Sequence, residues 1–108
     1  MPAGARIVRE ELFGPVLAVA GYQDEPQAIR LANDSPYGLA AGVWTSDMNA
    51  AHRLTGALHA GTVWVNTCER SPLATPFGGF KQSGSGRDRS PHALDTYCDL
   101  KTIWTAYT

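Results

Sequence analysis

The chain has 108 residues and a formal net charge of −1, with 44% hydrophobic and 18% charged residues. This balance is typical of a globular domain. It lacks both the basic excess of a nucleic-acid-binding protein and the run of roughly 20 apolar residues that a membrane helix needs. Two cysteines are too few for a secreted disulfide scaffold, and the N-terminus has no signal-peptide core. We therefore expect a cytoplasmic protein with no nucleic-acid or membrane partner.

The first predicted strand is residues 16–22, which are almost continuously apolar, as in a strand buried on both faces. A helix is predicted over residues 25–33. Asp24 precedes it as an N-cap, and Gln27 stands where a capping box has its second partner. The helix ends before Pro36, because the residue that precedes a proline resists the α conformation.

The same order of elements then repeats. Residues 39–45 form a second apolar strand, Ser46 or Asp47 caps a helix over 47–59, and residues 62–66 form a third strand. Strands that alternate with helices through short connections run parallel and are joined by right-handed crossovers. The predicted fold class is therefore α/β, with a parallel Rossmann-like half-sheet and crossover helices.

A loop of about twenty residues follows the third strand, a length that is usually functional in a compact domain. Ser90 and Pro91 begin a short helix over 91–98, in the N-cap and N1 positions. Residues 100–107 form a last strand, and both of its faces carry apolar side chains. Such a strand needs cover on both sides.

The glycine-rich loop 78–86 does not fit a phosphate-binding motif. It lacks the Gly-Lys-Ser/Thr end of a P-loop and the spacing of the dinucleotide fingerprint, so a turn-rich loop with several positive φ angles is predicted. The alternating charges at 87–89 indicate a solvated surface. No metal site is predicted, because the three histidines share no metal-ligand spacing and are expected to face solvent or cap helices: His52, His59 and His92.

The sequence itself assigns no catalytic residue. Cys68 lies in the loop at the carboxyl end of the third strand, where an open α/β sheet holds its ligands. No base accompanies it in the sequence, and a packed, unreactive thiol is the favoured interpretation. Glu10 and Glu11 indicate, on their chemistry alone, a solvated charge pair followed by a turn.

Four segments resemble the signature blocks of the NAD(P)-dependent aldehyde dehydrogenases. They are Arg-Glu-Glu-Leu-Phe-Gly-Pro-Val at 9–16, Ala-Asn-Asp-Ser-Pro-Tyr-Gly-Leu-Ala-Ala at 32–41, Gly-Thr-Val-Trp-Val-Asn at 61–66 and Pro-Phe-Gly-Gly-Phe-Lys-Gln-Ser-Gly-Ser-Gly-Arg at 76–87. Their order and spacing are those of the family, and the resemblance covers nearly the whole chain. The sequence is thus similar to the C-terminal part of such an enzyme.

The resemblance implies a cofactor contact. Glu11 matches the carboxylate that accepts hydrogen bonds from the nicotinamide-ribose hydroxyls, as an acceptor-only group can. Phe13 matches the aromatic residue that packs beside the nicotinamide. The cofactor would be NAD or NADP in the full-length enzyme, and the chain alone is expected to bind neither. Gly61 and Asn66 match structural residues of the third strand and its turn.

The resemblance also implies a substrate contact. Residues 67–77 match the segment that lines the aldehyde tunnel, and Phe77 matches the recurrent aromatic residue of its wall. Glu69 and Arg70 make this loop more polar than in family members that act on simple aliphatic aldehydes, unless both merely face solvent. The residues at 84–95 are most similar to members that act on amino- or γ-glutamyl-amino-aldehydes from polyamine breakdown.

The family's nucleophilic cysteine, general-base glutamate and dinucleotide-binding half have no counterpart in these 108 residues, so the chain alone is expected to be inert. Residues 1–98 would belong to the catalytic domain of an enzyme that oxidises an aldehyde to a carboxylic acid. Residues 99–108 would be the strand that joins a neighbouring subunit, giving a homodimer or larger oligomer. The alternative is a non-enzymatic binding or assembly module that kept the fold without the catalytic cysteine.

Overall fold

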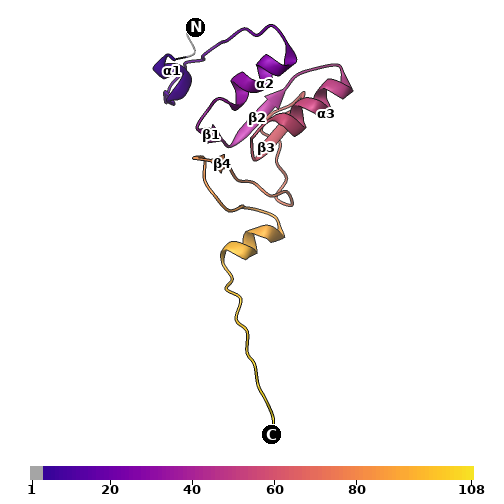
Figure 1. The fold of residues 1–108 in the computed structure, drawn as a ribbon. Coiled ribbons are helices and arrows are strands. Elements are labelled where there is room, and N and C mark those ends of the chain that lie inside the picture. Colours follow the sequence, from indigo (N-terminus) through magenta and orange to yellow (C-terminus); the bar gives the residue numbers. More distant parts are fainter. Residues whose placement is uncertain (1–3) are drawn as a thin grey trace.

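The computed structural model describes residues 4–108 (Figure 1). Its elements, in chain order, are α1 (Arg6–Arg9), α2 (Glu25–Asn33), β1 (Tyr37–Gly38), β2 (Ala40–Val43), α3 (Met48–Ala57), β3 (Thr62–Val65), β4 (Phe80–Lys81) and a 3-10 helix (Pro91–Thr96). Two small sheets pair β1 with β4 and β2 with β3. The chain is therefore a small α/β unit.

The β2–β3 pair is parallel, and α3 connects its two strands (Figure 1). Ala40 lies opposite Thr62, and Val43 lies opposite Val65. The prediction of parallel strands joined by a helix is confirmed for the second and third predicted strands. In the described part of the chain only Val43 and Ala51 are buried apolar residues, at 7% and 4% exposure, and they mark a small core between this sheet and α3.

Both helices begin with the predicted capping chemistry. The Asp24 carboxylate accepts a hydrogen bond from the Gln27 N–H at 2.7 Å, and Gln27 Oε1 accepts one from the Gln23 N–H at 2.6 Å. Of the two candidates for the second cap, Asp47 serves, because it accepts from the Asn49 N–H at 2.8 Å. These bonds satisfy N–H groups that the first turn of a helix leaves free.

Asn33 joins the C-terminal ends of α2 and α3. Its Nδ2 donates to the Ala57 carbonyl and its Oδ1 accepts from the His59 N–H, both at 2.8 Å. The Lys81 ammonium donates to the carbonyls of Asn33 at 2.8 Å and Ser35 at 3.0 Å. The last carbonyls of a helix have no intrahelical donor, so β4 supplies one to α2. Polar contacts thus supplement the small core.

The predicted first strand at 16–22 is wrong. The segment forms no strand, and its apolar side chains are exposed, with Leu17 at 82% and Val19 at 70%. An extended segment joins a sheet only beside an edge that offers hydrogen-bond partners. Both described sheets have two strands and so keep open edges, yet residues 16–22 pair with neither sheet. The apolar run indicated a surface that needs burial but could not show which element would cover it.

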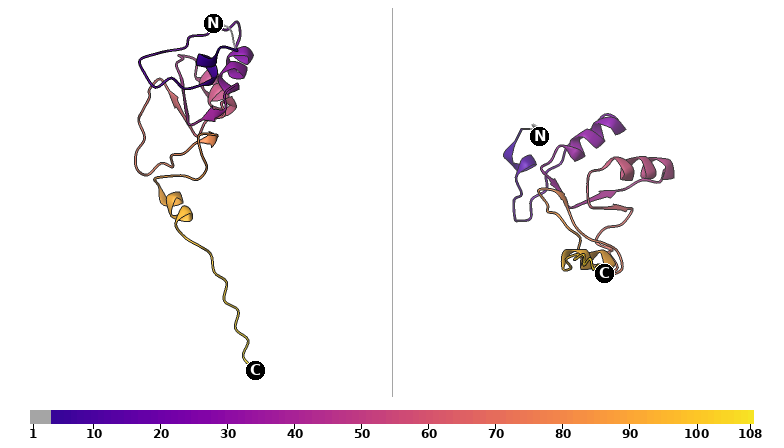
Figure 2. Two further views of the ribbon diagram at one scale, coloured as in Figure 1. Left: turned by 90° about the vertical axis from the view of Figure 1, so that its left-hand side faces the viewer. Right: turned by 60° about the horizontal axis from the view of Figure 1, so that its bottom comes forward.

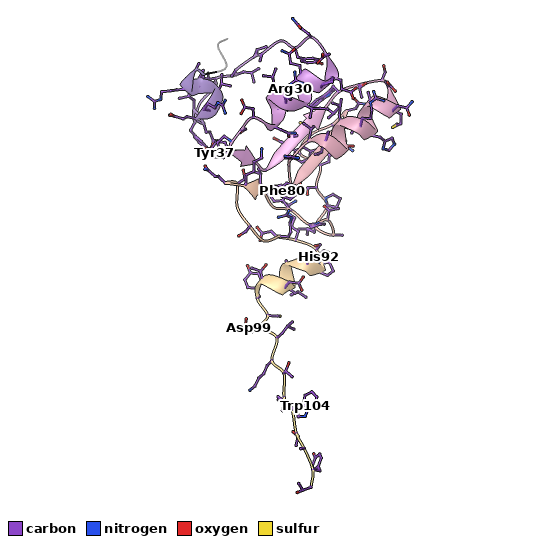
Figure 3. The ribbon with its side chains drawn as sticks, in the orientation of Figure 1. Arg30, Tyr37, Phe80, His92, Asp99 and Trp104 are labelled. Atoms are coloured by element: carbon purple, nitrogen blue, oxygen red, sulfur yellow. The ribbon has the colours of Figure 1, made fainter. Side chains whose placement is uncertain are left out.

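The helix predicted at 91–98 is present as the 3-10 helix Pro91–Thr96. The strand predicted at 100–107 follows it as an extended tail with no sheet partner among the described residues, and it projects away from the rest of the molecule (Figures 1 and 2). Trp104, on this tail in Figure 3, is 91% exposed. The radius of gyration is consequently 19.0 Å, against about 13 Å for a compact domain of about 100 residues.

The sequence did not predict α1 or the antiparallel β1–β4 pair. Tyr37 lies opposite Lys81 and Gly38 lies opposite Phe80, and Figure 3 shows Tyr37 and Phe80 at this junction. A strand of two residues has no periodicity from which it could be recognised. The pair matters because it holds the glycine-rich loop beside the N-terminal part of the chain.

Candidate functional site

Two adjoining cavities contain residues that the sequence assigns to cofactor and substrate. The larger, of about 470 Å³, lies between α1 with the residues after it and β1, and Glu11 lines it. The smaller, of about 200 Å³, is formed mainly by the glycine-rich loop, and Phe77 lines it. Leu39 and Ser83 line both cavities. The surroundings of Glu11 and Phe77 are therefore neighbours in space, although 66 positions separate the two residues in the sequence.

The wall common to the two cavities is fixed by hydrogen bonds to β1 and the residues before it. The Gly38 N–H donates to Ser83 Oγ at 3.0 Å, and the Gln82 N–H donates to the Pro36 carbonyl at 3.0 Å. Gly38 itself is buried. The glycine-rich loop is thereby held against β1, which keeps the two cavities side by side.

Glu11 differs from its charged neighbours in having no ion-pair partner in the described structure. Arg6 pairs with Glu10 at 2.7 Å, and this hydrogen bond raises the pKa of Arg6. Arg9 pairs with Asp34, also at 2.7 Å. Glu11 is exposed at the larger cavity, and its carboxylate is an acceptor that can take two hydroxyl donors at once.

Phe13 is fully exposed, at 102%, and lines neither of the two cavities. It lies two residues beyond Glu11 in a segment without regular structure. The structure therefore does not bring Phe13 against the cavity of Glu11, but it leaves the ring free to pack against a bound group. Its contact with a nicotinamide stays a prediction.

Phe77 is half-buried and held on both its backbone and its ring. Its N–H donates to the Asp88 carbonyl at 2.8 Å, and the Asp88 N–H donates back to the Phe77 carbonyl at 2.7 Å. The guanidinium carbon of Arg89 lies 5.2 Å from the centroid of the Phe77 ring, and that of Arg87 lies 5.1 Å from the Phe80 ring. Asp88 and Arg89 are exposed, as predicted for a solvated surface, but both arginines also form cation–π contacts.

Glu69 and Arg70 are exposed and line neither of the two cavities. Glu69 has a φ angle of 60°, and the Arg70 carbonyl accepts a hydrogen bond from Trp64 Nε1 at 2.7 Å. The backbone of this loop is thus attached to β3, while the two charged side chains face solvent. Their contact with a substrate stays a prediction.

Cys68 is exposed, so the expectation of a packed thiol is wrong. The loop that carries it lies on the surface, and no described element covers this position. All three histidines are exposed, as expected. Between residues 4 and 108 no three metal-ligating side chains converge. Gly84 and Gly86 have φ angles of 119° and 82°, which confirms the turn-rich character of the glycine loop.

Sequence analysis missed three residues that support the site: Ser83, Arg89 and Trp64. Each acts through a hydrogen bond to another segment, at separations of 45, 18 and 6 residues in the chain. Such contacts leave no periodic or motif-like signal. The alternating charge around Arg89 was the one visible sign, and it was interpreted as solvation.

Residues 1–103 match the aldehyde dehydrogenase family, and the chain belongs to this family. The NADP/NAD-dependent aldehyde dehydrogenase PuuC of Escherichia coli (strain K12) is 55% identical over 100 residues, which are 93% of this chain and 20% of PuuC. Betaine aldehyde dehydrogenase 1 of Rhizobium meliloti (strain 1021) is 50% identical over 101 residues, 94% of this chain and 21% of that protein. The chain spans about a fifth of the length of the curated relatives it matches.

Solved structures give the same result. The indole-3-acetaldehyde dehydrogenase AldA of P. syringae, in complex with NAD+ and IAA, superposes with a TM-score of 0.91 at 50% identity, over 99% of this chain and 22% of AldA. The aldehyde dehydrogenase KauB of Pseudomonas aeruginosa has a TM-score of 0.91 at 53% identity, over 97% of this chain and 21% of KauB. The resemblance read from four sequence blocks is thus confirmed, and the α/β unit is part of the aldehyde dehydrogenase fold.

None of the helices within residues 4–108 is both long and apolar enough to span a bilayer.

Proposed function

We propose that the chain supplies the cofactor-side carboxylate and the substrate loop of an NAD(P)-dependent aldehyde dehydrogenase, which oxidises an aldehyde to a carboxylic acid. One observation carries this proposal: Glu11 and Phe77 line cavities that share Leu39 and Ser83. A cofactor in the first cavity would adjoin an aldehyde in the second. Hydride transfer requires that adjacency, because the reacting atoms must be held in contact.

The residues present fit a nicotinamide-ribose group. Glu11 is unpaired in the described structure and can accept hydrogen bonds from both ribose hydroxyls, which orients the ring that they carry. Phe13 offers an exposed aromatic face two residues further on. NAD or NADP supplies the hydride acceptor when bound. We propose that the isolated chain binds neither cofactor, since Glu11 and Phe13, the two residues assigned to the cofactor, would contact only its nicotinamide end.

The substrate side is assigned to residues 67–77. Phe77 forms the aromatic wall, and Glu69 with Arg70 provides charge at the solvent end of the loop. An amino- or γ-glutamyl-amino-aldehyde is the proposed substrate class, because such a substrate has polar groups that two exposed charged side chains can meet. The 55% identity to PuuC supports placing the chain among the NADP/NAD-dependent members.

The proposed organisation has two parts. Residues 1–98 belong to the catalytic domain, in which β2, α3 and β3 are one parallel crossover unit of a Rossmann-like half-sheet. Residues 99–108 are an oligomerisation strand that joins another subunit, an assignment supported by their extended backbone and exposed apolar side chains. Alone, the chain is proposed to be inert, since no base accompanies Cys68.

A second candidate function is an assembly module that binds aldehyde dehydrogenase subunits without chemistry. The observation that favours it is the exposed apolar surface of residues 16–22 and of the tail, because uncovered apolar surface favours association. Under the first candidate function, Glu11 and Phe77 contribute to turnover. Under the second, only the apolar surface matters, and it serves binding.

A fusion protein distinguishes the two candidate functions. The chain replaces the matching fifth of PuuC, and reduced cofactor is followed by absorbance with propanal and with an aminoaldehyde. We expect turnover by the fusion and none by the chain alone. Glu11→Gln should raise the KM for the cofactor about tenfold through a weakened charge-assisted hydrogen bond. Glu10→Gln is the matched control, because Arg6 already occupies that carboxylate. An inactive fusion that still assembles would favour the second candidate.

A further inference from the structure

Arg89 and Ser90 contact the loop that carries Phe77. Arg89 Nη1 donates to the Ser71 carbonyl at 3.0 Å, and its guanidinium carbon lies 5.2 Å from the centroid of the Phe77 ring. The Ser90 N–H donates to the Leu73 carbonyl at 2.9 Å. Since these contacts fall on three successive parts of the loop, they fix both its backbone path and the orientation of its one aromatic ring.

The backbone that carries Arg89 and Ser90 is strained. Arg89 and Ser90 have φ angles of 59° and 55°, and Ser90 with a ψ of 171° lies where glycine is found almost exclusively. Ser90 Oγ accepts a hydrogen bond from the His92 N–H at 3.3 Å, as the predicted cap of the 3-10 helix. Strain of this kind persists where surrounding contacts over-determine it, often at functional sites. Here it lies at the residue whose guanidinium faces the Phe77 ring.

We propose that Arg89 sets the charge specificity of the substrate loop: it holds Phe77 in place and disfavours aldehydes whose far end is cationic relative to those with a neutral or carboxylate-bearing end. This inference rests on the proposed function, in which Phe77 is part of the tunnel wall. Arg89 acts through Phe77 and is therefore a positioning residue.

The physical reason is that an aromatic face attracts one cation, and Arg89 already occupies one face of Phe77. A substrate cation on the opposite face would lie about 5 Å from the centroid, hence about 10 Å from the guanidinium. Repulsion between unit charges at that separation, in a partly solvated site, lowers the apparent affinity about two- to fourfold, and a carboxylate gains by a similar factor.

The other charges around the smaller cavity do not reverse the expected preference against cationic substrates. Arg87 and Asp88 both line it and are of opposite charge, so their effects at a distance largely offset. Arg89 is left as the uncompensated charge beside the ring. Of the two proposed substrate types, the aminoaldehydes carry a net positive charge, whereas the γ-glutamyl-amino-aldehydes carry an ammonium and a carboxylate together, so this arrangement disfavours the aminoaldehydes.

Hydrogen exchange of the purified 108-residue chain tests the positioning, without any enzyme activity. Arg89→Met should speed exchange of the Phe77 and Ser90 amides about fivefold, the effect of losing one hydrogen bond and the ring contact. Arg30→Met is the matched control, because it removes the same charge from the exposed face of α2 (Figure 3). Unchanged exchange in Arg89→Met, or unprotected amides in the parent chain, would overturn the positioning.

The fusion with PuuC tests the specificity. The ratio of kcat/KM for a trimethylammonium aldehyde to that for hexanal should rise about two- to fourfold in Arg89→Met. Arg89→Lys should speed amide exchange yet keep the parent ratio, because it retains the charge but not the planar fork. A ratio that is unchanged in Arg89→Met, or that rises equally in Arg89→Lys, would overturn the charge argument. A parent fusion without any activity counts against the proposed function alone, since amide exchange still decides the positioning.

Discussion

The side chain of Asn66 pairs with both backbone polar groups of Thr45. Asn66 Oδ1 accepts from the Thr45 N–H at 2.9 Å, and its Nδ2 donates to the Thr45 carbonyl at 2.8 Å. Its own N–H donates to the Val43 carbonyl at 2.8 Å. The side chain thus continues the β2–β3 ladder by one step, at a φ angle of 54° that asparagine tolerates better than most residues. The substrate loop consequently starts from a fixed point.

Replacing this side chain is expected to weaken the end of the sheet. Asn66→Ala should lower the free energy of unfolding by about 1–3 kcal/mol, through two lost hydrogen bonds and a left-handed alanine. Asn66→Gly is the control: it loses the same bonds but adopts the positive φ freely, so about 1 kcal/mol of the loss should return. Urea unfolding measures both. Equal stability of the alanine variant and the parent would contradict the role of the amide.

Gly61, directly before β3, lies close to Gly78 of the glycine-rich loop. A Cβ at this position would overlap the carbonyl group of Gly78, which is backbone and cannot swing away as a side chain can. Gly61→Ala should therefore displace the loop next to Phe77 and cost about 1–3 kcal/mol of stability. Gly56→Ala in α3 is the contrast, since nothing lies within 4 Å of the added methyl and alanine favours helix by about 0.5–1 kcal/mol. Urea midpoints that move in opposite directions would bear this out, and a Gly61→Ala variant as stable as the parent would refute it.

The parts of the fold that the sequence predicts are those set by local chemistry. The caps at Asp24 and Asp47 follow from side chains that reach backbone N–H groups two or three positions away. The strand at 16–22 failed because pairing depends on another element, and an apolar run cannot specify it. The pair of β1 with β4 joins two-residue strands more than 40 positions apart, for which no pattern exists.

The candidate site, too, has a part that the sequence predicts and a part that depends on contacts between distant segments. Glu11 and Phe77 could be named from resemblance alone, but their adjacency depends on Ser83 and the β1 contact, which are properties of the folded chain. Arg89 was visible only as one of several alternating charges. It lies over Phe77 in a backbone with two consecutive positive φ angles, which the residue types at 89 and 90 do not favour.

The ion pair between Glu25 and Arg53 joins α2 to α3 and should make stability depend on pH. Arg53 Nε and Nη2 donate to the two Glu25 oxygens at 2.9 Å each, and this hydrogen bonding lowers the pKa of Glu25 below its ordinary value of 4.5. Because the folded-state pKa is depressed, the contribution is fully present above pH 4.5. It is lost as the pH falls through the lower folded-state value.

The measurement is a comparison of the parent with Glu25→Gln in urea at about pH 7 and about pH 3. The parent should be the more stable near pH 7, and the difference should shrink at the acidic end. Arg53→Gln should show the same convergence, and the double variant should add little to either. A difference that is constant across this range would mean that the pair contributes nothing through its charge.

Self-association is the last expectation, and it follows from apolar surface that the described chain leaves uncovered. Two separate surfaces qualify: residues 16–22, where Leu17 is 82% exposed, and the tail 100–107, where Trp104 is 91% exposed. An unpaired extended tail can add a strand to the edge of a sheet in another copy, because its N–H and C=O groups are free. We expect a homodimer or larger oligomer at micromolar concentration.

Light scattering across a dilution series tests this, and two variants identify the surface responsible. Deleting residues 100–108 should convert most of the oligomer to monomer, since it removes both the backbone donors and the apolar side chains of the tail. Leu17→Ser with Val19→Ser should have the smaller effect, because it lowers apolar area while leaving the pairing backbone in place. A parent chain that stays monomeric at every concentration would refute the expectation. If the double serine variant dissociates and the deletion does not, association depends on the exposed face at 16–22, and the tail is not an oligomerisation strand.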